Sequence, residues 1–248
     1  MSARPVLVVK VGTSTLLGTH EQPSEAFGYV AKSIKSLRKQ YDIVLVTSGA
    51  IGFGVRQLGL DTRPDELHQL QALSMIGQVG LLRKWHEAFN DVTVGQVLVT
   101  RHDLEKRTTS TLLKESVGSV WQYGALPIVN ENDAVAFEEI SFGDNDRLAA
   151  EVAVALGAET LVLLTDQDGI QAEFGSERQS RLASVRIDEI DTHIHATKSY
   201  LGKGGASSKV QAARVALEAG IRVFIAHAGH KSSLENVLAG KVGTKIVQ

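Results

Sequence analysis

The sequence predicts a three-layer α/β/α sandwich built on a mainly parallel sheet. Five short runs consist almost entirely of apolar residues, which is typical of strands that are buried on both faces. Between them lie longer segments whose apolar residues recur at helical spacing, and an alternation of strands with helices is typical of a parallel sheet. The runs are residues 6–9, 43–46, 126–129, 160–164 and 221–226.

Composition limits the size of the fold and the classes of partner. The chain has 248 residues, of which 43% are hydrophobic, enough for one large α/β domain or for two lobes that share a sheet. A formal net charge of −2 argues against nucleic acid or an anionic membrane as the main partner, because both usually select a basic patch. The absence of cysteine excludes disulfides and thiolate chemistry. No apolar stretch has the length of a membrane span or a signal-peptide core, so we expect a cytoplasmic protein.

The first predicted strand ends at Lys10, and Gly12 follows it. Ligands of open α/β sheets bind at the carboxyl ends of strands, so this lysine is a candidate for contact with an anion. A strand-end lysine that simply reaches solvent is the alternative. Residues 24–41 then have the apolar spacing of a helix that packs back on the sheet.

The second predicted strand leads into Ser48 and Gly49, in a turn of small residues before a helix. Such a turn leaves backbone N–H groups free, and the helix dipole adds to their attraction for a phosphate or a carboxylate. Glycine also permits close packing of a helix on a strand, so both interpretations stay open. The next predicted segments are helices at 65–89, interrupted near Gly77, and at 112–121, a strand at 92–99, and a charged loop with a helix start at 100–107.

Two clusters of acidic and amide residues lie close together in the middle of the chain. Residues 130–133, Asn-Glu-Asn-Asp, end the third apolar run, and residues 143–146, Gly-Asp-Asn-Asp, precede a helical segment that begins near Leu148. Together they predict a site for an ammonium group or for magnesium. The alternative is a charged capping loop, in which Asp144 or Asn145 caps the helix.

The last third of the chain contains a glycine- and lysine-rich segment at residues 202–209. A flexible loop of this composition that opens a helix suits a polyphosphate, because glycine lets the backbone approach and lysine supplies point charge. A plain linker is the alternative. The strand before this segment ends in Thr165 and Asp166, a turn that fits the border of a nucleotide pocket. The remaining segments are a polar excursion or hairpin at 170–187, a helix with a capping box of Ser232 and Glu235, and a final strand at 244–247.

Seven motifs occur in an order that resembles the glutamate 5-kinases of the amino acid kinase superfamily. Three of them, Ser-Gly-Ala-Ile, Asn-Glu-Asn-Asp and Phe-Gly-Asp-Asn-Asp, are specific in combination to that family within the superfamily. The resemblance extends over essentially the whole chain. The motifs begin at Lys10, Ser48, Gly95, Asn130, Phe142, Leu164 and Gly204.

The resemblance implies phosphoryl transfer from ATP to the γ-carboxylate of L-glutamate, the first step of proline biosynthesis. It implies Mg²⁺ that bridges the ATP phosphates and is held by phosphate and water more than by protein carboxylates. It also implies a homo-oligomer, feedback inhibition by L-proline, and a product that passes to glutamyl phosphate reductase. We expect no nucleic-acid or membrane partner. A kinase for another amino-acid carboxylate and a non-catalytic amino-acid sensor of the same fold are the alternatives.

The resemblance also assigns roles to individual residues. Lys10 and Lys209 would flank the transferred phosphoryl group, and Asp146 would orient both lysines. Gly12 and Gly49 would offer backbone N–H groups to the phosphates and the acceptor. The acceptor-binding set would be Ser48, Gly49, Asp133, which holds the α-ammonium, and Asn145. The ATP-binding set would be Lys10, Gly12, Thr165, Asp166, Lys203, Gly204, Gly205 and Lys209.

As a domain prediction, residues 1–248 form a single amino acid kinase domain. Residues up to about 155 would bind the acceptor, and about 156–248 would bind ATP. Two features differ from the family pattern. The sequence stops at Gln248, so we expect no C-terminal RNA-modification-type (PUA) domain, and residues 107–112 lack the tyrosine and asparagine usual there.

Overall fold

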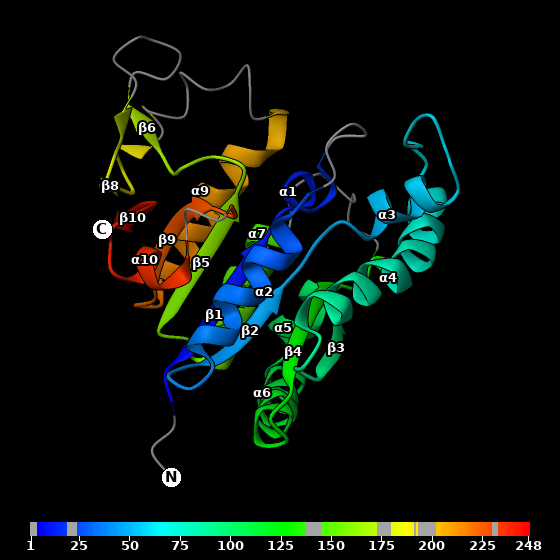
Figure 1. Cartoon of the computed structure of the whole chain (residues 1–248), viewed down its shortest axis with the longest axis horizontal. Helices are drawn as coiled ribbons and strands as arrows, with labels where there is room; N and C mark the ends of the chain where they lie inside the picture. Colours follow the sequence, from blue (N-terminus) through cyan, green and yellow to red (C-terminus); the bar gives the residue numbers. More distant parts are fainter. Residues whose placement is uncertain are drawn as a thin grey trace.

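A computed structural model describes residues 4–18, 24–136, 145–172, 180–190, 192, 202–229 and 233–248, with only the backbone for residues 202–206. These residues form an eight-stranded sheet in the order β3-β4-β2-β1-β5-β9-β10-β8 and a separate antiparallel pair, β6 with β7. Figure 1 shows the large sheet between helices on both sides. The strands are β1 Val6–Val11, β2 Asp42–Val46, β3 Val94–Val99, β4 Leu126–Glu131, β5 Thr160–Thr165, β6 Gln171–Ala172, β7 Ser180–Arg181, β8 Ser184–Arg186, β9 Arg222–His227 and β10 Thr244–Val247.

The six strands from β3 to β9 in this order are parallel, whereas β10 pairs antiparallel with β9 and parallel with β8. The prediction of a mainly parallel three-layer sandwich is therefore confirmed. The helices are α1 Thr13–Leu17, α2 Ala26–Leu37, α3 Ala50–Gln57, α4 Leu67–Phe89, α5 Arg101–Glu105, α6 Arg107–Gln122, α7 Asn145–Leu156, α9 Gly202–Glu218 and α10 Leu234–Leu238.

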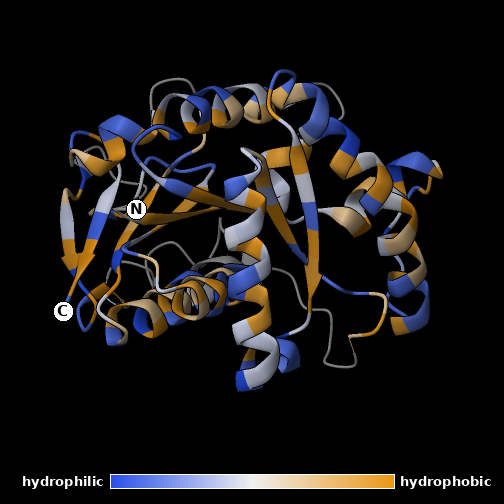
Figure 2. Cartoon of the chain, turned by 90° about the horizontal axis from the view of Figure 1, so that it is seen from below, coloured by the Kyte–Doolittle hydropathy of each residue, from blue (hydrophilic) through white to orange (hydrophobic). Residues whose placement is uncertain are grey.

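Strand β1 divides the core into two layers because successive side chains of a strand point to opposite faces. Leu7 and Val9 pack with α2, α4 and α10, whereas Val8 packs with α6, α7 and α9. Figure 2 shows the resulting apolar strands between the helical layers. Lys10 is two positions after Val8, so its side chain points toward the layer of α7 and α9.

The carboxyl ends of the central parallel strands lie along one edge of the sheet. Lys10 pairs in register with Val46 of β2 and Leu163 of β5, so the ends of these three strands are level. The first residue of α7, Asn145, is next to this edge, where its side chain contacts the backbone of Thr47 just after β2. The fold therefore brings several of the predicted site segments to one edge.

Four local predictions need correction. Helix α4 is continuous through Gly77, where a Cβ atom would lie 1.9 Å from the carbonyl oxygen of Ala50, so the glycine permits close packing on α3 and does not interrupt the helix. Residues 101–105 form a helix, because Thr100 and Asp103 complete a capping box.

Helix α10 is capped by Ser233, whose hydroxyl accepts from the backbone N–H of Asn236; Ser232 lies outside the described residues. The segment 202–209, predicted as a flexible loop, is the start of α9.

Within the described ranges, no helix combines the length and the apolar character needed to cross a membrane.

Candidate active site

Three charged side chains from three distant segments meet at the carboxyl edge of the sheet. Asp146, the second residue of α7, places Oδ1 2.6 Å from Nζ of Lys10 on β1. Its Oδ2 lies 3.0 Å from Nζ of Lys209 on α9 and accepts a hydrogen bond of 2.8 Å from the hydroxyl of Ser208. The sequence separation of Lys10, Asp146 and Lys209 spans most of the chain, so only the fold brings them together. We call these three residues the ion-pair cluster.

The side chains of the ion-pair cluster are almost completely buried. The side chains of Lys10 and Asp146 are 3% and 0% exposed, and that of Lys209 is 18% exposed. Burial lowers the pKa of Lys10, with Asp146 opposing and Lys209 adding to the decrease. Burial alone would raise the pKa of Asp146, but the two lysines outweigh it and hold that pKa below its usual value. With one carboxylate for two ammonium groups, the cluster keeps an excess positive charge that suits an anion.

Gly12 leaves space beside the ammonium group of Lys10. A Cβ atom at this position would lie 3.6 Å from Nζ of Lys10 and 3.9 Å from the hydroxyl of Thr15. Any larger side chain would extend into the region next to the ion-pair cluster. The glycine that follows β1 therefore keeps open the approach to the buried charge.

The turn after β2 packs against the turn after β1. Gly49 has a left-handed backbone, with φ of 107°, and a Cβ atom there would lie 3.7 Å from Cγ2 of Thr13. The hydroxyl of Ser48 donates to the carbonyl oxygen of Val11 over 3.0 Å. Because this bond uses the only hydrogen of the hydroxyl, Ser48 can offer a ligand lone pairs but no donor.

Asn145 is held by two acceptors. Its Nδ2 donates to the carbonyl oxygen of Thr47 at 2.6 Å and to Oδ1 of Asn130 at 2.7 Å. Asn130 in turn donates from Nδ2 to Oε1 of Gln78 at 2.8 Å. Both amide hydrogens of Asn145 are thereby taken, and among the described residues none donates to its Oδ1, which is left as an acceptor. Asn145 is the first residue of α7 and not its cap, and Asp144 lies outside the described residues.

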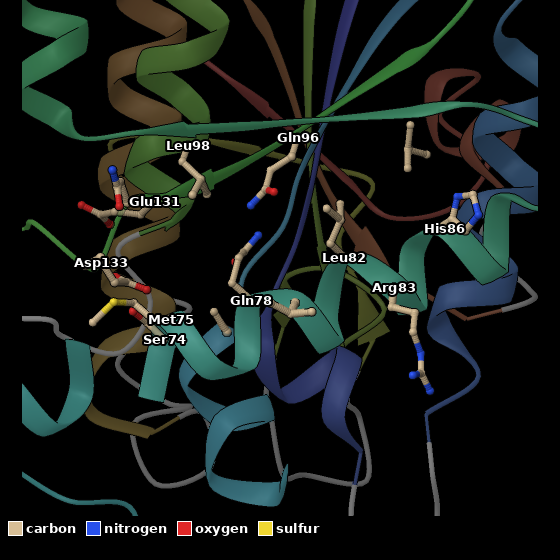
Figure 3. A pocket seen from close by; sticks show the side chains of 15 residues that line it. Ser74, Met75, Gln78, Leu82, Arg83, His86, Gln96, Leu98, Glu131 and Asp133 are labelled. Carbon is tan, nitrogen blue, oxygen red and sulfur yellow. The ribbon is translucent and has the colours of Figure 1, made fainter. Parts of the chain in front are cut away.

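Asp133 follows β4 and lines an open cavity of about 700 Å³ between α4 and strands β3 and β4. In Figure 3 its side chain lies near Ser74 and Met75 of α4. Burial raises the pKa of Asp133 to about 6, and Arg63 acts in the opposite direction. Asp133 belongs to this cavity, whereas none of the three residues of the ion-pair cluster lines it.

Two of the predicted nucleotide residues, Thr165 and Asp166, lie at the end of the strand on the other side of β1 from this cavity. Thr165 ends the neighbouring strand β5, is buried, and donates from its hydroxyl to Oδ1 of Asp166, which is exposed. Lys203, Gly204 and Gly205 belong to the beginning of α9, where the structure describes only the backbone. The same helix carries Lys209, so the start of α9 is linked directly to the ion-pair cluster.

The described residues offer no protein cage for magnesium. In these parts of the chain, no group of three or more His, Cys, Asp or Glu side chains is arranged to hold a metal ion. Both oxygens of Asp146 already face lysine ammonium groups. Among the residues that the structure describes, the donor set therefore does not fit a metal held mainly by protein ligands.

Three residues that hold the site have no individual role assigned from the sequence. Thr47 and Asn130 hold the amide of Asn145, and Gln78 holds Asn130. Asn130 carried a signal, since it opens the polar cluster after the third apolar run. Gln78 carried none, because a glutamine on a half-exposed helix face looks like an ordinary solvated residue.

Comparisons with known proteins place the chain in a family. A model of the amino acid kinase family matches residues 5–227. A glutamate 5-kinase of Gloeobacter violaceus is 39% identical over 249 residues, and one of Clostridium acetobutylicum is 36% identical over 244 residues. The chain belongs to the amino acid kinase family, and within it to the glutamate 5-kinases. These alignments cover 96% and 94% of the chain, and 67% and 90% of the two relatives.

The chain is shorter than several of these relatives. A glutamate 5-kinase of Thermus thermophilus is 38% identical over 239 residues, which are 94% of this chain but 65% of that protein. The chain thus spans slightly less than two thirds of its length. The resemblance found in the motifs is confirmed, whereas the individual roles of the site residues stay predictions.

Solved structures support the fold. Carbamate kinase from Giardia lamblia bound to AMP-PNP aligns with a TM-score of 0.69 at 15% identity, over 100% of this chain and 99% of that one. N-acetylglutamate synthase from Neisseria gonorrhoeae aligns with a TM-score of 0.71 at 18% identity, over 98% of this chain and 61% of that one. At such low identities the likeness concerns the architecture alone.

Proposed function

We propose that this chain transfers the γ-phosphoryl group of ATP to the γ-carboxylate of L-glutamate, giving ADP and L-glutamyl 5-phosphate, the first step of proline biosynthesis. The observation that carries the proposal is the ion-pair cluster. Two lysines on opposite oxygens of one buried aspartate, at the carboxyl edge of the sheet, form an anion-binding centre in a chain related to glutamate 5-kinases.

The chemistry needs charge neutralisation more than proton transfer. A glutamate side chain, with a reference pKa of about 4.3, is already ionised at neutral pH. An oxygen of this carboxylate forms the new bond to the γ-phosphorus, while the bond to the bridging oxygen breaks and its electron pair leaves with ADP. Lys10 and Lys209 would offset the repulsion between the acceptor and the phosphates. Asp146 would hold both ammonium groups in place and would not act as a base, because its two oxygens face the lysines.

The acceptor pocket would present lone pairs to the α-ammonium of glutamate. Ser48 gives its hydrogen to Val11, and Asn145 gives both amide hydrogens to neighbours, so each offers a ligand only an oxygen acceptor. Asp133 would add a negative charge, and the backbone at Gly49 would add an N–H group. This set suits a free α-amino group better than an acylated one, because a charged donor forms the stronger hydrogen bond.

The nucleotide would lie against β5 and the start of α9. Thr165 and Asp166 end β5, and Lys203, Gly204 and Gly205 form the N-terminal turn of a 17-residue helix, where free N–H groups and the dipole favour phosphate. Magnesium would come with the ATP phosphates. We accordingly propose an acceptor lobe up to about residue 155 and a nucleotide lobe from about 156 onward.

Partners follow from the same proposal. The product is an acyl phosphate, a reactive mixed anhydride that suits direct transfer to a reductase. We propose that the chain works in the cytoplasm as a homo-oligomer, and that L-proline inhibits it as the end product of the pathway.

The test is ADP release with magnesium and ATP in the presence of L-glutamate, N-acetyl-L-glutamate, L-aspartate or no acceptor, with hydroxylamine to trap an acyl phosphate. We expect a hydroxamate with L-glutamate alone. Lys10→Ala and Lys209→Ala should each reduce turnover by several orders of magnitude while the far-UV spectrum stays that of a folded protein. Near-normal turnover in either lysine variant would refute the mechanism. Glutamate binding without any turnover would instead identify a sensor.

A further inference from the structure

Gln78 lies on α4, outside the residues that the proposed function uses. Its Oε1 accepts from Nδ2 of Asn130, and Oδ1 of Asn130 accepts from Nδ2 of Asn145. The two hydrogen bonds measure 2.8 and 2.7 Å. We call the chain Gln78–Asn130–Asn145 the amide relay. It connects the wall of the large cavity with the first residue of α7.

The amide relay has a direction, because each side-chain amide has one acceptor end and one donor end. With the oxygen of Gln78 facing it, Asn130 must turn its NH₂ group toward α4 and its carbonyl toward Asn145. Asn145 must then turn its own NH₂ group toward Asn130, where the carbonyl of Thr47 takes the second hydrogen. If the side-chain amide of Asn130 were flipped, its carbonyl would face the carbonyl of Gln78, and its NH₂ group would face the NH₂ group of Asn145. The oxygen of Gln78 therefore sets the orientation of Asn130, and Asn130 together with the carbonyl of Thr47 sets which end of Asn145 remains available.

The surroundings make this orientation rigid. Asn130 is 2% exposed, so water cannot readily replace Gln78 as its partner. Trp85, two turns farther along α4, donates from Nε1 to the hydroxyl oxygen of Thr47 over 2.9 Å. This bond holds Thr47, whose backbone carbonyl accepts the second amide hydrogen of Asn145. Helix α4 thus orders both acceptors that hold Asn145. Gly77, immediately before Gln78, lets α4 approach α3 closely enough to do so.

We propose that Gln78 is a positioning residue that determines acceptor specificity. Through the amide relay it makes Asn145 present a carbonyl oxygen, which suits an ammonium donor, and prevents the flipped form, whose NH₂ group would suit a carboxylate. The inference rests on the acceptor role proposed above for Asn145. It predicts that the relay affects affinity for the amino acid and leaves the nucleotide side unchanged.

The cavity supplies a matched control. In Figure 3 the side chains of Gln78 on α4 and Gln96 on β3 extend toward one another from opposite walls. Gln96 is exposed, and no hydrogen bond joins it to the amide relay among the described contacts. Gln96→Met therefore removes the same chemical group from the same cavity without touching the relay.

The experiment compares Gln78→Met, Gln78→Glu and Gln96→Met. Methionine keeps the length of glutamine but offers only a weakly accepting sulfur, so we expect Gln78→Met to raise the KM for L-glutamate about tenfold, the effect of one lost hydrogen bond, with the KM for ATP unchanged. Glutamate retains an oxygen acceptor toward Asn130, so Gln78→Glu should recover most of the loss. Gln96→Met should match the unmodified protein.

A second readout does not depend on catalysis. The side-chain NH₂ signals of Asn130 and Asn145 in ¹⁵N spectra should exchange slowly with solvent in the unmodified protein and in Gln78→Glu, and faster in Gln78→Met. If the unmodified protein transferred no phosphoryl group, the proposed function would fail while these signals still tested the relay. Unchanged Asn145 signals in Gln78→Met, or an equal rise in KM in Gln96→Met, would overturn the proposal.

Discussion

Replacing Asp133 with asparagine should stabilise the protein while weakening its acceptor site. Burial raises the pKa of Asp133 to about 6, from an ordinary value of 3.8. A carboxyl group with this shift favours the folded state while it is protonated, and this advantage is lost as the pH rises through about 6. At pH 7 the folded protein therefore bears the cost of a poorly solvated charge. Asparagine has nearly the same shape and does not ionise.

The size of the effect follows from the shift. Two pKa units at about 1.36 kcal/mol each amount to about 3 kcal/mol at pH 7, which is the gain in unfolding free energy expected for Asp133→Asn. At pH 4, near the pKa of the unfolded chain, the same linkage gives a gain of less than about 1 kcal/mol. This pH dependence distinguishes the electrostatic cost from changes in packing or hydrogen bonding, which do not titrate.

The assay is urea unfolding of both proteins at pH 4, 5, 6 and 7 without ligand. A control of opposite sign is Asp91→Asn, since the surface carboxylate of Asp91 bonds to Lys35 and has a pKa below its usual value. That variant should lose stability at the higher pH values, where the carboxylate of Asp91 is ionised and bonded to Lys35. A stability difference between Asp133→Asn and the unmodified protein that is constant from pH 4 to 7 would refute the reasoning. In activity assays Asp133→Asn should raise the KM for L-glutamate with little change for ATP.

Three further substitutions test the packing and the charge of the site. Gly77→Ala should destabilise the protein by more than about 3 kcal/mol, because its Cβ would lie 1.9 Å from the carbonyl oxygen of Ala50. On the same helix, Gly80→Ala meets nothing closer than 3.5 Å and should stabilise by about 0.5–1 kcal/mol; equal unfolding midpoints for the two variants would contradict this. Asp146→Asn should cost roughly 3–5 kcal/mol, because it leaves the buried ammonium of Lys10 without its carboxylate, and should abolish turnover. Thermal unfolding at neutral pH measures the loss, and an unchanged midpoint would show that Asp146 does not neutralise Lys10.

The strands of the central sheet could be predicted because their residues are buried on both faces. In β1 and β5 almost every position is apolar and covered, so the sequence itself carries the signal. Strands β7 and β8 are short and partly exposed, and their polar sequences predicted no more than a hairpin region. The order of the strands was not predictable, because it depends on how the helices between them cross the two faces.

The charged residues of the site were easier to predict than the residues that hold them. Lys10 stands out because it ends a predicted buried strand, and Asp146 because it ends a polar cluster just before a helical segment. The composition of residues 202–209 predicts a flexible loop that opens a helix. These residues are helical instead, although glycine and serine disfavour helices, and Lys209 on that helix is tied to Asp146. Tertiary contacts outweigh local helix propensity in this segment, and no pattern within the segment predicts those contacts.

The amide relay shows why this second group escapes sequence reasoning. Asn145 and Asn130 are 15 positions apart, and Asn130 and Gln78 are 52 apart, so no periodicity joins them. The relay exists because β4 carries Asn130 on the face that α4 covers, while the first residue of α7 lies at the carboxyl edge of the sheet, within reach of that face. A charged group can be recognised by its type and its place at a strand end. A neutral amide gains its role only from the orientation that its neighbours impose, and that orientation is a property of the folded chain.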